Sequence, residues 1–163
     1  MSHVPRRYDF HDKAADYVRL ADELAGLLAG ETDWIANAAN TSALIFEALP
    51  DLNWAGVYLL KGNELVVGPF QGRPACVRIA MGKGVCGAAA ARRETIVVPD
   101  VEKFPGHIAC DSASRSEIVI PLISNAALLG VLDIDSPRLN RFDTSDRHGL
   151  ERLAALFVAG SRL

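Results

Sequence analysis

The chain has 163 residues, of which half are hydrophobic and 23% are charged, so a folded chain is expected. The formal net charge of −3 disfavours nucleic acid as the main partner, because duplex binders usually carry a basic excess. No run of about 18 apolar residues occurs, so no membrane-spanning helix is expected. Residues 1–12 lack the apolar region of a secretory signal, which favours a cytoplasmic, reducing location.

Two amphipathic helices are expected near the N-terminus, after a flexible segment at residues 1–11. Residues 12–163 are predicted to form one domain. Apolar residues recur at steps of three and four from 12 to 29 and again from 33 to 49. The predicted inner face of the second helix consists of Ile35, Ala39, Ser42, Phe46 and Leu49.

Beyond residue 53 the pattern changes to short strands separated by turns. Strand-like runs lie at 54–60, 64–70, 75–80, 95–98, 116–123 and 128–134. A glycine-rich turn at 82–87 is expected to lead into a short helix at 88–92, and a last helix is expected after Phe142. Because most neighbouring strands are hairpin partners, the prediction is an α+β fold with a largely antiparallel sheet of about six strands and helices on its faces.

The chain has three cysteines, Cys76, Cys86 and Cys110, with no CxxC pair. A zinc site usually draws its ligands from closely spaced pairs, and His107 is the only histidine near a cysteine, so no metal is expected. Three buried cysteines acting as small hydrophobic residues are one alternative. Glycine, proline and charged neighbours instead favour accessible positions at loops and element ends.

Several stretches together carry a resemblance to one family. They are NWAGVYLL at 53–60, GPFQGRPACVRI at 68–79, GKGVCGAAA at 82–90, VPDVEKFPGHIACDSASRSEIVIPLI at 98–123, GVLDIDSP at 130–137 and RFDTSDRHGLE at 141–151. This set resembles the free methionine-(R)-sulfoxide reductases, which are small enzymes built on a GAF domain. The resemblance implies a GAF-like catalytic domain at 12–163 that reduces free methionine (R)-sulfoxide without a cofactor, with thioredoxin as the reductant.

The resemblance also implies a division of labour among the cysteines. It assigns the attacking thiolate to Cys110 and the resolving thiol to Cys76. Cys86, in the glycine-rich turn, is expected to be an auxiliary catalytic thiol. Residue chemistry also favours Cys110, because it lies in a long polar loop with His107 and Arg115 available to stabilise an anion.

Three acidic residues are predicted to share one pocket. Asp133 and Asp135 flank Ile134, so strand alternation places both carboxylates on one face, and Glu117 opens a neighbouring strand. Like charges held close together raise at least one pKa and keep that acid protonated. The resemblance implies acid catalysis by Glu117 and Asp135 and substrate binding by Asp133. The alternative is that the two aspartates only cap a turn before Pro137.

Trp54 and Tyr58 lie four residues apart on a predicted strand and therefore share a face. A core stripe is the commoner fate of such residues, whereas the resemblance makes them a wall for the methyl and thioether end of the substrate. Val57 and Leu59 are then expected to face covering helices. The glycine turn at 82–87 is expected to hold the substrate carboxylate.

Two other functions remain as alternatives. GAF domains often bind small ligands as sensors without catalysis, and a Cys76–Cys110 disulfide could itself be a redox signal. The cysteine and carboxylate set favours the enzyme, because a pure sensor needs no resolving thiol. The oligomeric state is left open, with a homodimer among the alternatives.

Overall fold

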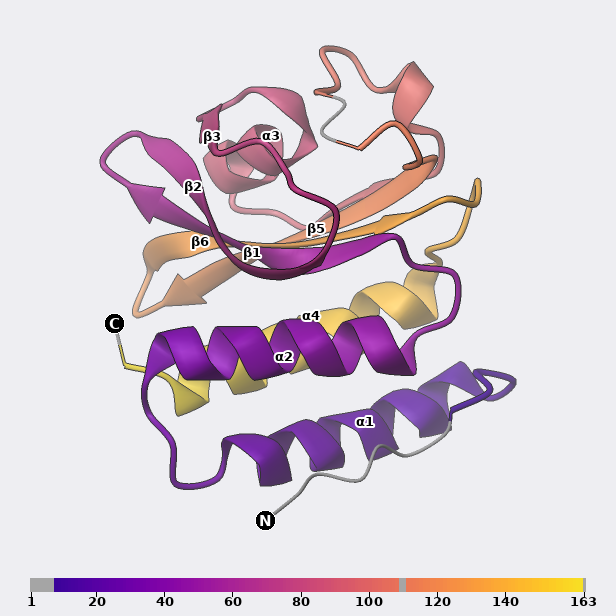
Figure 1. Ribbon diagram of the computed structural model, residues 1–163, viewed down its shortest axis with the longest axis vertical. Coiled ribbons are helices and arrows are strands. Elements are labelled where there is room, and N and C mark those ends of the chain that lie inside the picture. Colours follow the sequence, from indigo (N-terminus) through magenta and orange to yellow (C-terminus); the bar gives the residue numbers. More distant parts are fainter. Residues whose placement is uncertain (1–7, 109–110, 163) are drawn as a thin grey trace.

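A single antiparallel sheet organises the computed structural model, which describes residues 8–108 and 111–162 (Figure 1). Its strands follow the spatial order β3-β2-β1-β6-β5-β4, and every pairing is antiparallel. The strands are β1 Trp54–Lys61, β2 Glu64–Gly72, β3 Arg78–Ala80, β4 Ile96–Val98, β5 Ser116–Ser124 and β6 Ala127–Ser136. The α+β prediction is confirmed.

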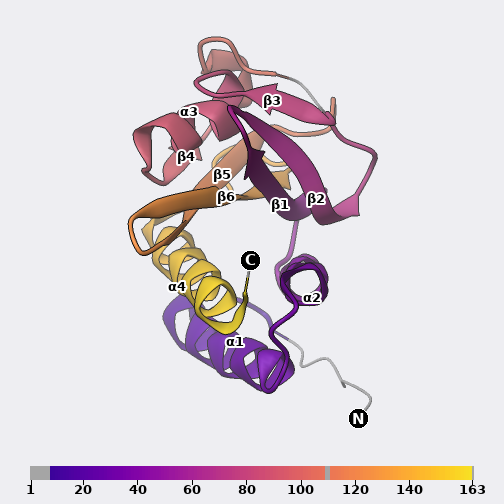
Figure 2. The same cartoon turned by 90° about the vertical axis from the view of Figure 1, so that its left-hand side faces the viewer.

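Helices cover both faces of the sheet in layers. The helices are α1 Lys13–Leu28, α2 Trp34–Ala48, α3 Gly84–Arg92 and α4 Thr144–Gly160, with a 3-10 turn, η1, at Val101–Lys103. Helices α2 and α4 lie side by side against one face, and α1 packs beneath them (Figure 2). Helix α3 covers the opposite face, and the loop that follows β4 lies on that same face (Figure 1).

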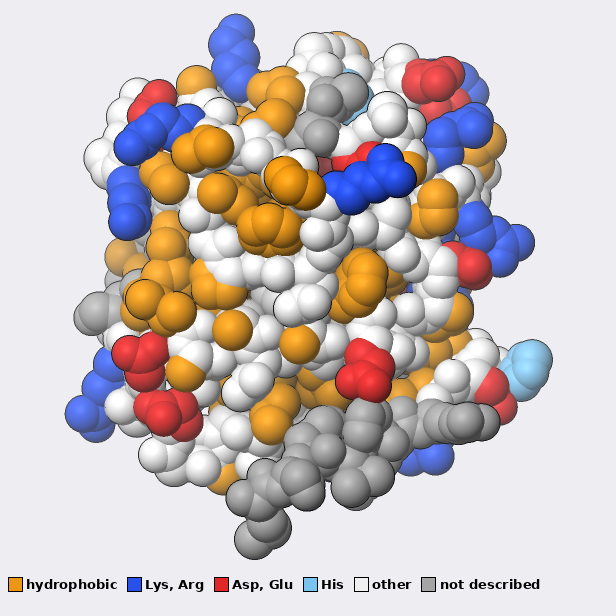
Figure 3. All heavy atoms as spheres, viewed as in Figure 1, with side chains coloured by type: hydrophobic (Ala, Val, Ile, Leu, Met, Phe, Trp, Pro, Cys, Tyr) orange, Lys and Arg blue, Asp and Glu red, His pale blue; other side chains and the backbone are white. Residues whose placement is uncertain are grey.

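Strand alternation divides the hydrophobic residues into two cores. Val57 and Leu59 face α2 and α4 in the larger core, as expected from the sequence. Trp54 and Tyr58 face the other way and belong to the smaller core under α3. On the face that Figure 3 shows, acidic and basic side chains are dispersed among hydrophobic ones. In the described ranges, 8–108 and 111–162, no helix has the length and apolar character needed to cross a membrane.

Aspartates fix the starts of the three long helices. The side chains of Asp12, Asp33 and Asp143 accept hydrogen bonds from backbone N–H groups in the first turns of α1, α2 and α4. At α4 the arrangement is reciprocal, because Asp146 also accepts from the Asp143 N–H in a capping box. Such caps satisfy N–H groups that the helix itself leaves without partners.

The structure corrects three local expectations. Ile35 is 58% exposed, because α2 buries the face of Ala38, Ile45 and Ala48 instead. Phe10 is buried in the larger core, so the described end of the predicted flexible segment, residues 8–11, is anchored there. Helix α3 begins at Gly84, four residues before the predicted start, since its packing against the sheet overrides the low helix propensity of glycine.

The predicted third strand is also shorter than expected. Only Arg78–Ala80 pairs with β2, and residues 73–77 connect the two strands. Pro74 lacks the N–H that a sheet ladder requires, which limits strand formation in this connection. The connecting segment carries Cys76 and passes over the aromatic side chains of the smaller core.

Candidate active site

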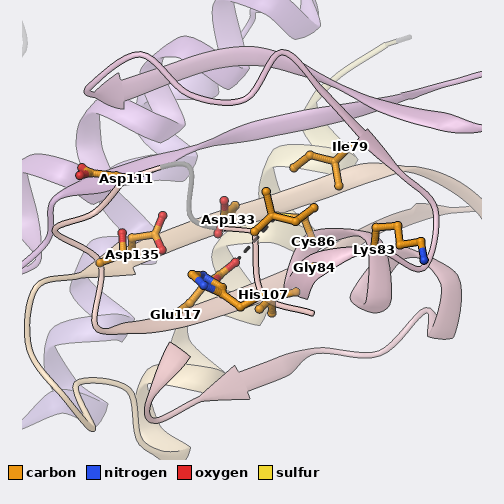
Figure 4. A pocket seen from close by; sticks show the side chains of 12 residues that line it. Ile79, Lys83, Gly84, Cys86, His107, Asp111, Glu117, Asp133 and Asp135 are labelled. Atoms are coloured by element: carbon orange, nitrogen blue, oxygen red, sulfur yellow. Dashed lines mark hydrogen bonds and ion pairs between the residues drawn. The ribbon is translucent and has the colours of Figure 1, made fainter. Parts of the chain in front are cut away.

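Three carboxyl groups converge on the sheet face that α3 covers. Glu117 pairs with Asp135 across β5 and β6, and Asp133 lies two residues before Asp135 on the same face. All three side chains line one pocket, as strand alternation predicts (Figure 4). The turn-capping alternative for the two aspartates is wrong, because both lie within β6.

Burial makes ionisation of these groups costly. Glu117 and Asp133 are each 6% exposed. Burial, followed by the charges of Asp133 and Asp135, raises the pKa of Glu117 well above its ordinary value. Burial and the Asp133 charge raise the pKa of Asp135 in the same way, and burial raises the pKa of Asp133 to about 6. The pocket therefore favours the protonated form of its acids.

Cys86 closes the pocket from the first turn of α3. Its side chain is 4% exposed, and its Sγ atom lies 3.9 Å from Oε1 of Glu117. Burial, followed by the neighbouring charges of Asp133 and Glu117, raises the pKa of the Cys86 thiol. The sequence-based expectation of an accessible cysteine in a turn is wrong here, because α3 starts at Gly84 and presses Cys86 against the sheet.

His107 lies at the edge of the same pocket, in the loop between η1 and β5. Its Nε2 atom is 3.7 Å from Oε2 of Glu117, and burial lowers the pKa of the imidazole. The shifts favour a neutral imidazole beside an acid that retains its proton to higher pH than an exposed glutamate does. Lys83 and Gly84 complete this side at the N-terminus of α3, where helical N–H groups lack partners within the helix (Figure 4).

A polar network ties the neighbouring loop to the start of β1. The Asn53 side-chain amide donates to Oδ2 of Asp111 and to Oγ of Ser114, both at 3.0 Å. The Ala113 N–H, with Asn53 and Arg73, lowers the pKa of Asp111. The lowered pKa favours an ionised Asp111. This residue lines both the acidic pocket and a second, neighbouring cavity, each of which Asp133 and Asp135 also line.

The second cavity is aromatic on one side. Trp54 stacks against Tyr58 and Phe70 with ring centroids 5.8 and 5.2 Å apart. Gly56 leaves room for this stack, since a Cβ there would lie 2.6 Å from the Trp54 ring. Asp133 and Asp135 line both cavities, so the aromatic pair and the acids form one continuous site.

Comparison with known proteins identifies the family. The GAF domain model matches residues 35–159. The free methionine-R-sulfoxide reductase of Escherichia coli is 53% identical over 88% of this chain and 87% of its own. The Saccharomyces cerevisiae protein of the same name is 50% identical over 80% and 77% of the two chains. This chain belongs to the free methionine-R-sulfoxide reductase family. Its relatives are thus oxidoreductases built on a GAF domain.

A solved structure of the same family extends the match to the whole fold. The free methionine-R-sulfoxide reductase of Neisseria meningitidis, in complex with its substrate, superposes with a TM-score of 0.92. The two sequences are 46% identical, and the alignment covers 98% of this chain and 95% of the other. The complex shows that a pocket on this fold can bind the substrate of that relative.

In this member of the free methionine-R-sulfoxide reductase family, most of the predicted site residues gather in the joined cavities. They are Trp54, Tyr58, Cys86, Glu117, Asp133 and Asp135. Cys76 is disulfide-bonded, and its backbone oxygen accepts a hydrogen bond from Tyr58. Cys110, the predicted nucleophile, lies outside the described residues.

Several pocket residues escape prediction from the sequence. The sequence indicates no role for Asn53, Asp111 or Ser114, and it does not predict the contact between His107 and Glu117. These contacts join loops to strands far apart in the chain, where no periodic pattern exists. The density of polar residues in the 101–114 loop is the one signal that marks the region.

Proposed function

We propose that this chain reduces free L-methionine (R)-sulfoxide to methionine with thiol chemistry. The observation that carries the proposal is the joined site, in which buried protonated acids lie beside a stacked aromatic pair. A sulfoxide needs a proton for its departing oxygen and an apolar surface for its methyl group. One pocket meets both requirements, and two relatives of the chain are named free methionine-R-sulfoxide reductases.

Each charged end of the amino acid has a complementary partner in the pocket. Oδ1 of Asp133 is buried without a hydrogen-bond partner among the described residues, and we assign it to the substrate ammonium. The N–H groups at the start of α3, with Lys83 beside them, suit the substrate carboxylate. An internal residue of a peptide has neither charge, so oxidised proteins are expected to be poor substrates.

Glu117 and Asp135 are the proposed acids. Their raised pKa values keep a proton available at neutral pH, and that proton passes to the sulfoxide oxygen during attack on sulfur. The Trp54 and Tyr58 rings hold the methyl and thioether groups, so that the S=O bond points towards the acids. Cys86 donates its thiol hydrogen bond to Glu117 and acts as an auxiliary residue rather than the nucleophile.

The covalent steps are assigned to the other two cysteines. The Cys110 thiolate attacks the sulfoxide sulfur, methionine leaves, and the oxygen stays on Cys110 as a sulfenic acid. The Cys76 thiol then displaces that oxygen as water and forms a disulfide with Cys110. A thioredoxin-type dithiol, as found in a reducing cytoplasm, restores both thiols by exchange. The disulfide-bonded state of Cys76 supports its assignment as a redox-active residue.

The function is tested by following methionine release from three substrates in the presence of a dithiol. Free (R)-sulfoxide should be consumed completely, whereas free (S)-sulfoxide and a peptide containing methionine sulfoxide should remain. Comparable rates on the peptide would refute the assignment of both charged ends. A ligand-sensing GAF domain would bind the free amino acid without releasing methionine.

A further inference from the structure

Three buried side chains in the acidic pocket have the composition of a metal site. Cys86 contributes a sulfur atom, and Glu117 and Asp133 each contribute a carboxylate oxygen. These three atoms lie within 4.8 Å of one another, and all three residues are buried. Tetrahedral zinc with ordinary bond lengths separates its ligand atoms by roughly 3.5 Å. Small side-chain movements would therefore bring the three atoms into a coordination shell.

A second observation, an unpartnered carboxylate oxygen, points to a cationic ligand for this cluster. Oδ1 of Asp133 is buried and has no hydrogen-bond partner among the described residues, although Asp133 lines the pocket. Over residues 8–108 and 111–162, no lysine or arginine forms an ion pair with Glu117 or Asp133. Buried charges are normally paired or bound to metal.

His107 supplies a fourth group of the appropriate chemistry. Its Nε2 atom lies 3.7 Å from Oε2 of Glu117, and its side chain lines the same pocket (Figure 4). Imidazole nitrogen, thiolate sulfur and carboxylate oxygen are all ordinary zinc ligands. Calcium and magnesium prefer sites made only of oxygen, so the sulfur favours a thiophilic ion.

We propose that Cys86, Glu117 and Asp133, with His107 beside them, bind one thiophilic divalent cation of the Zn²⁺ class. The inhibitory consequence rests on the proposed function, since the ion would occupy the place assigned to the substrate ammonium and sulfoxide oxygen. On binding, the Cys86 thiol and the Glu117 carboxyl each lose a proton to water, and the metal binds the sulfur and the carboxylate oxygens with no change of oxidation state. Zinc is thereby a competitive inhibitor that chelation removes.

Cobalt gives a test in which the sulfur ligand is seen directly. The variant Cys76→Ser/Cys110→Ser keeps Cys86 as its single thiol and is titrated with Co²⁺ without oxygen. The expected result is a sulfur-to-cobalt charge-transfer band together with the visible bands of tetrahedral cobalt, saturating at one ion per chain. Added Zn²⁺ should abolish both bands.

The matched control is the same variant with Cys86→Ser added, which should lose the charge-transfer band while its circular dichroism is unchanged. A band that persists in this control, or no band with Cys86 present, would overturn the site. Replacing the buried Cys86 could disturb the fold, so Asp133→Asn in the Cys76→Ser/Cys110→Ser background serves as a second probe of the site. It should weaken Co²⁺ binding by about tenfold or more.

The inhibitory role is measured separately on the wild-type chain. Zn²⁺ should raise the KM for free methionine sulfoxide without changing kcat, and a chelator should restore the original KM. Methionine release that is unaffected by saturating Zn²⁺ would overturn the inhibition. Absence of release from metal-free wild type would instead count against the proposed function, and the cobalt titration would still decide whether the metal site exists.

Discussion

The Tyr58 hydroxyl donates a hydrogen bond to the backbone oxygen of Cys76 at 3.1 Å. On the same face of β1, the Trp54 indole N–H donates to the backbone oxygen of Arg73, also at 3.1 Å. These bonds fasten the segment that connects β2 with β3 to the centre of the sheet. Burial raises the pKa of Tyr58, so its phenol stays a hydrogen-bond donor. Two aromatic residues thus position the proposed resolving cysteine.

Tyr58→Phe should separate the two halves of the reaction, because it keeps the ring and removes only the hydroxyl. Methionine release in the first turnover should be nearly unchanged. Formation of the disulfide should slow by about three- to tenfold, as expected for loss of one hydrogen bond. Rapid quenching with thiol mapping measures both steps. Tyr17→Phe, which removes a buried hydroxyl far from Cys76, is the matched control. Equal slowing of both steps would contradict a positioning role.

Replacing the proposed acids should affect chemistry more than binding. Glu117→Gln and Asp135→Asn should each lower kcat by about two orders of magnitude or more, the usual scale for general acid catalysis. Asp133→Asn should raise KM, because Asp133 is assigned to the substrate ammonium. Steady-state kinetics with free sulfoxide measure these effects, and Glu151→Gln on the exposed side of α4 is the control. Wild-type kinetics in all three pocket variants would refute the acidic-pocket mechanism.

The buried Glu117 carboxyl should lower the free energy of unfolding as the pH rises. The pKa of Glu117 in the folded chain lies well above 4.5, its ordinary value. As pH rises past 4.5, the unfolded chain releases this proton while the folded chain retains it, so wild-type stability falls. Glu117→Gln does not titrate, and its stability relative to wild type should grow by about 1 kcal/mol or more between pH 4 and pH 8. Urea denaturation at several pH values measures the difference, and a pH-independent difference would contradict this origin.

A buried carboxylate on the other side of the sheet, Asp146, should affect the stability of the fold but not catalysis. Asp146 on α4 is fully buried and accepts hydrogen bonds from Tyr17 at 2.9 Å, Lys13 at 2.6 Å and Arg141 at 3.1 Å. Asp146→Asn leaves the buried Arg141 guanidinium uncompensated, which should cost about 3 kcal/mol. Denaturant unfolding measures the loss.

The control for Asp146 is an exposed ion pair on the same helix. Glu151→Gln removes the pair between Arg147 and Glu151, and the expected cost is only about 0–1 kcal/mol. The folded fraction of Asp146→Asn should keep the wild-type kcat, because Asp146 lies on the face covered by α2 and α4 and the acidic pocket lies on the face covered by α3. If Asp146→Asn lowered the free energy of unfolding by less than Glu151→Gln does, the hydrogen bonds and ion pairs of Asp146 would contribute nothing to stability.

Strand periodicity explains why much of the site is predictable. The period of two places Asp133 and Asp135 on one face, and the hairpin between β5 and β6 brings Glu117 beside them. The same alternation places Trp54 and Tyr58 on one face of β1 and Val57 and Leu59 on the opposite face. These relationships depend only on local geometry and on pairing between neighbouring strands.

Relationships that depend on tertiary packing are not predictable in this way. The buried face of α2 is only partly the predicted one: Ser42 and Leu49 are buried as expected, but Ile35 is exposed and Ile45 is buried. Apolar residues occur nearly all round this helix, so periodicity alone does not select one stripe. Cys86 belongs to α3 although Gly84 and Gly87 lie close to it in the sequence, since a buried helix start tolerates glycine. The contact of His107 with Glu117 joins a loop to a strand and leaves no pattern in the sequence.

The claim that this pocket is a thiol reductase rather than a ligand sensor is tested most directly by the first turnover of the cysteine variants. Without added reductant, Cys76→Ser should release one methionine per chain and leave a sulfenic acid that dimedone traps. Cys110→Ser should release none, because a serine hydroxyl is a far poorer nucleophile. A full burst of methionine from Cys110→Ser, or no burst from the reduced wild-type chain, would contradict the mechanism.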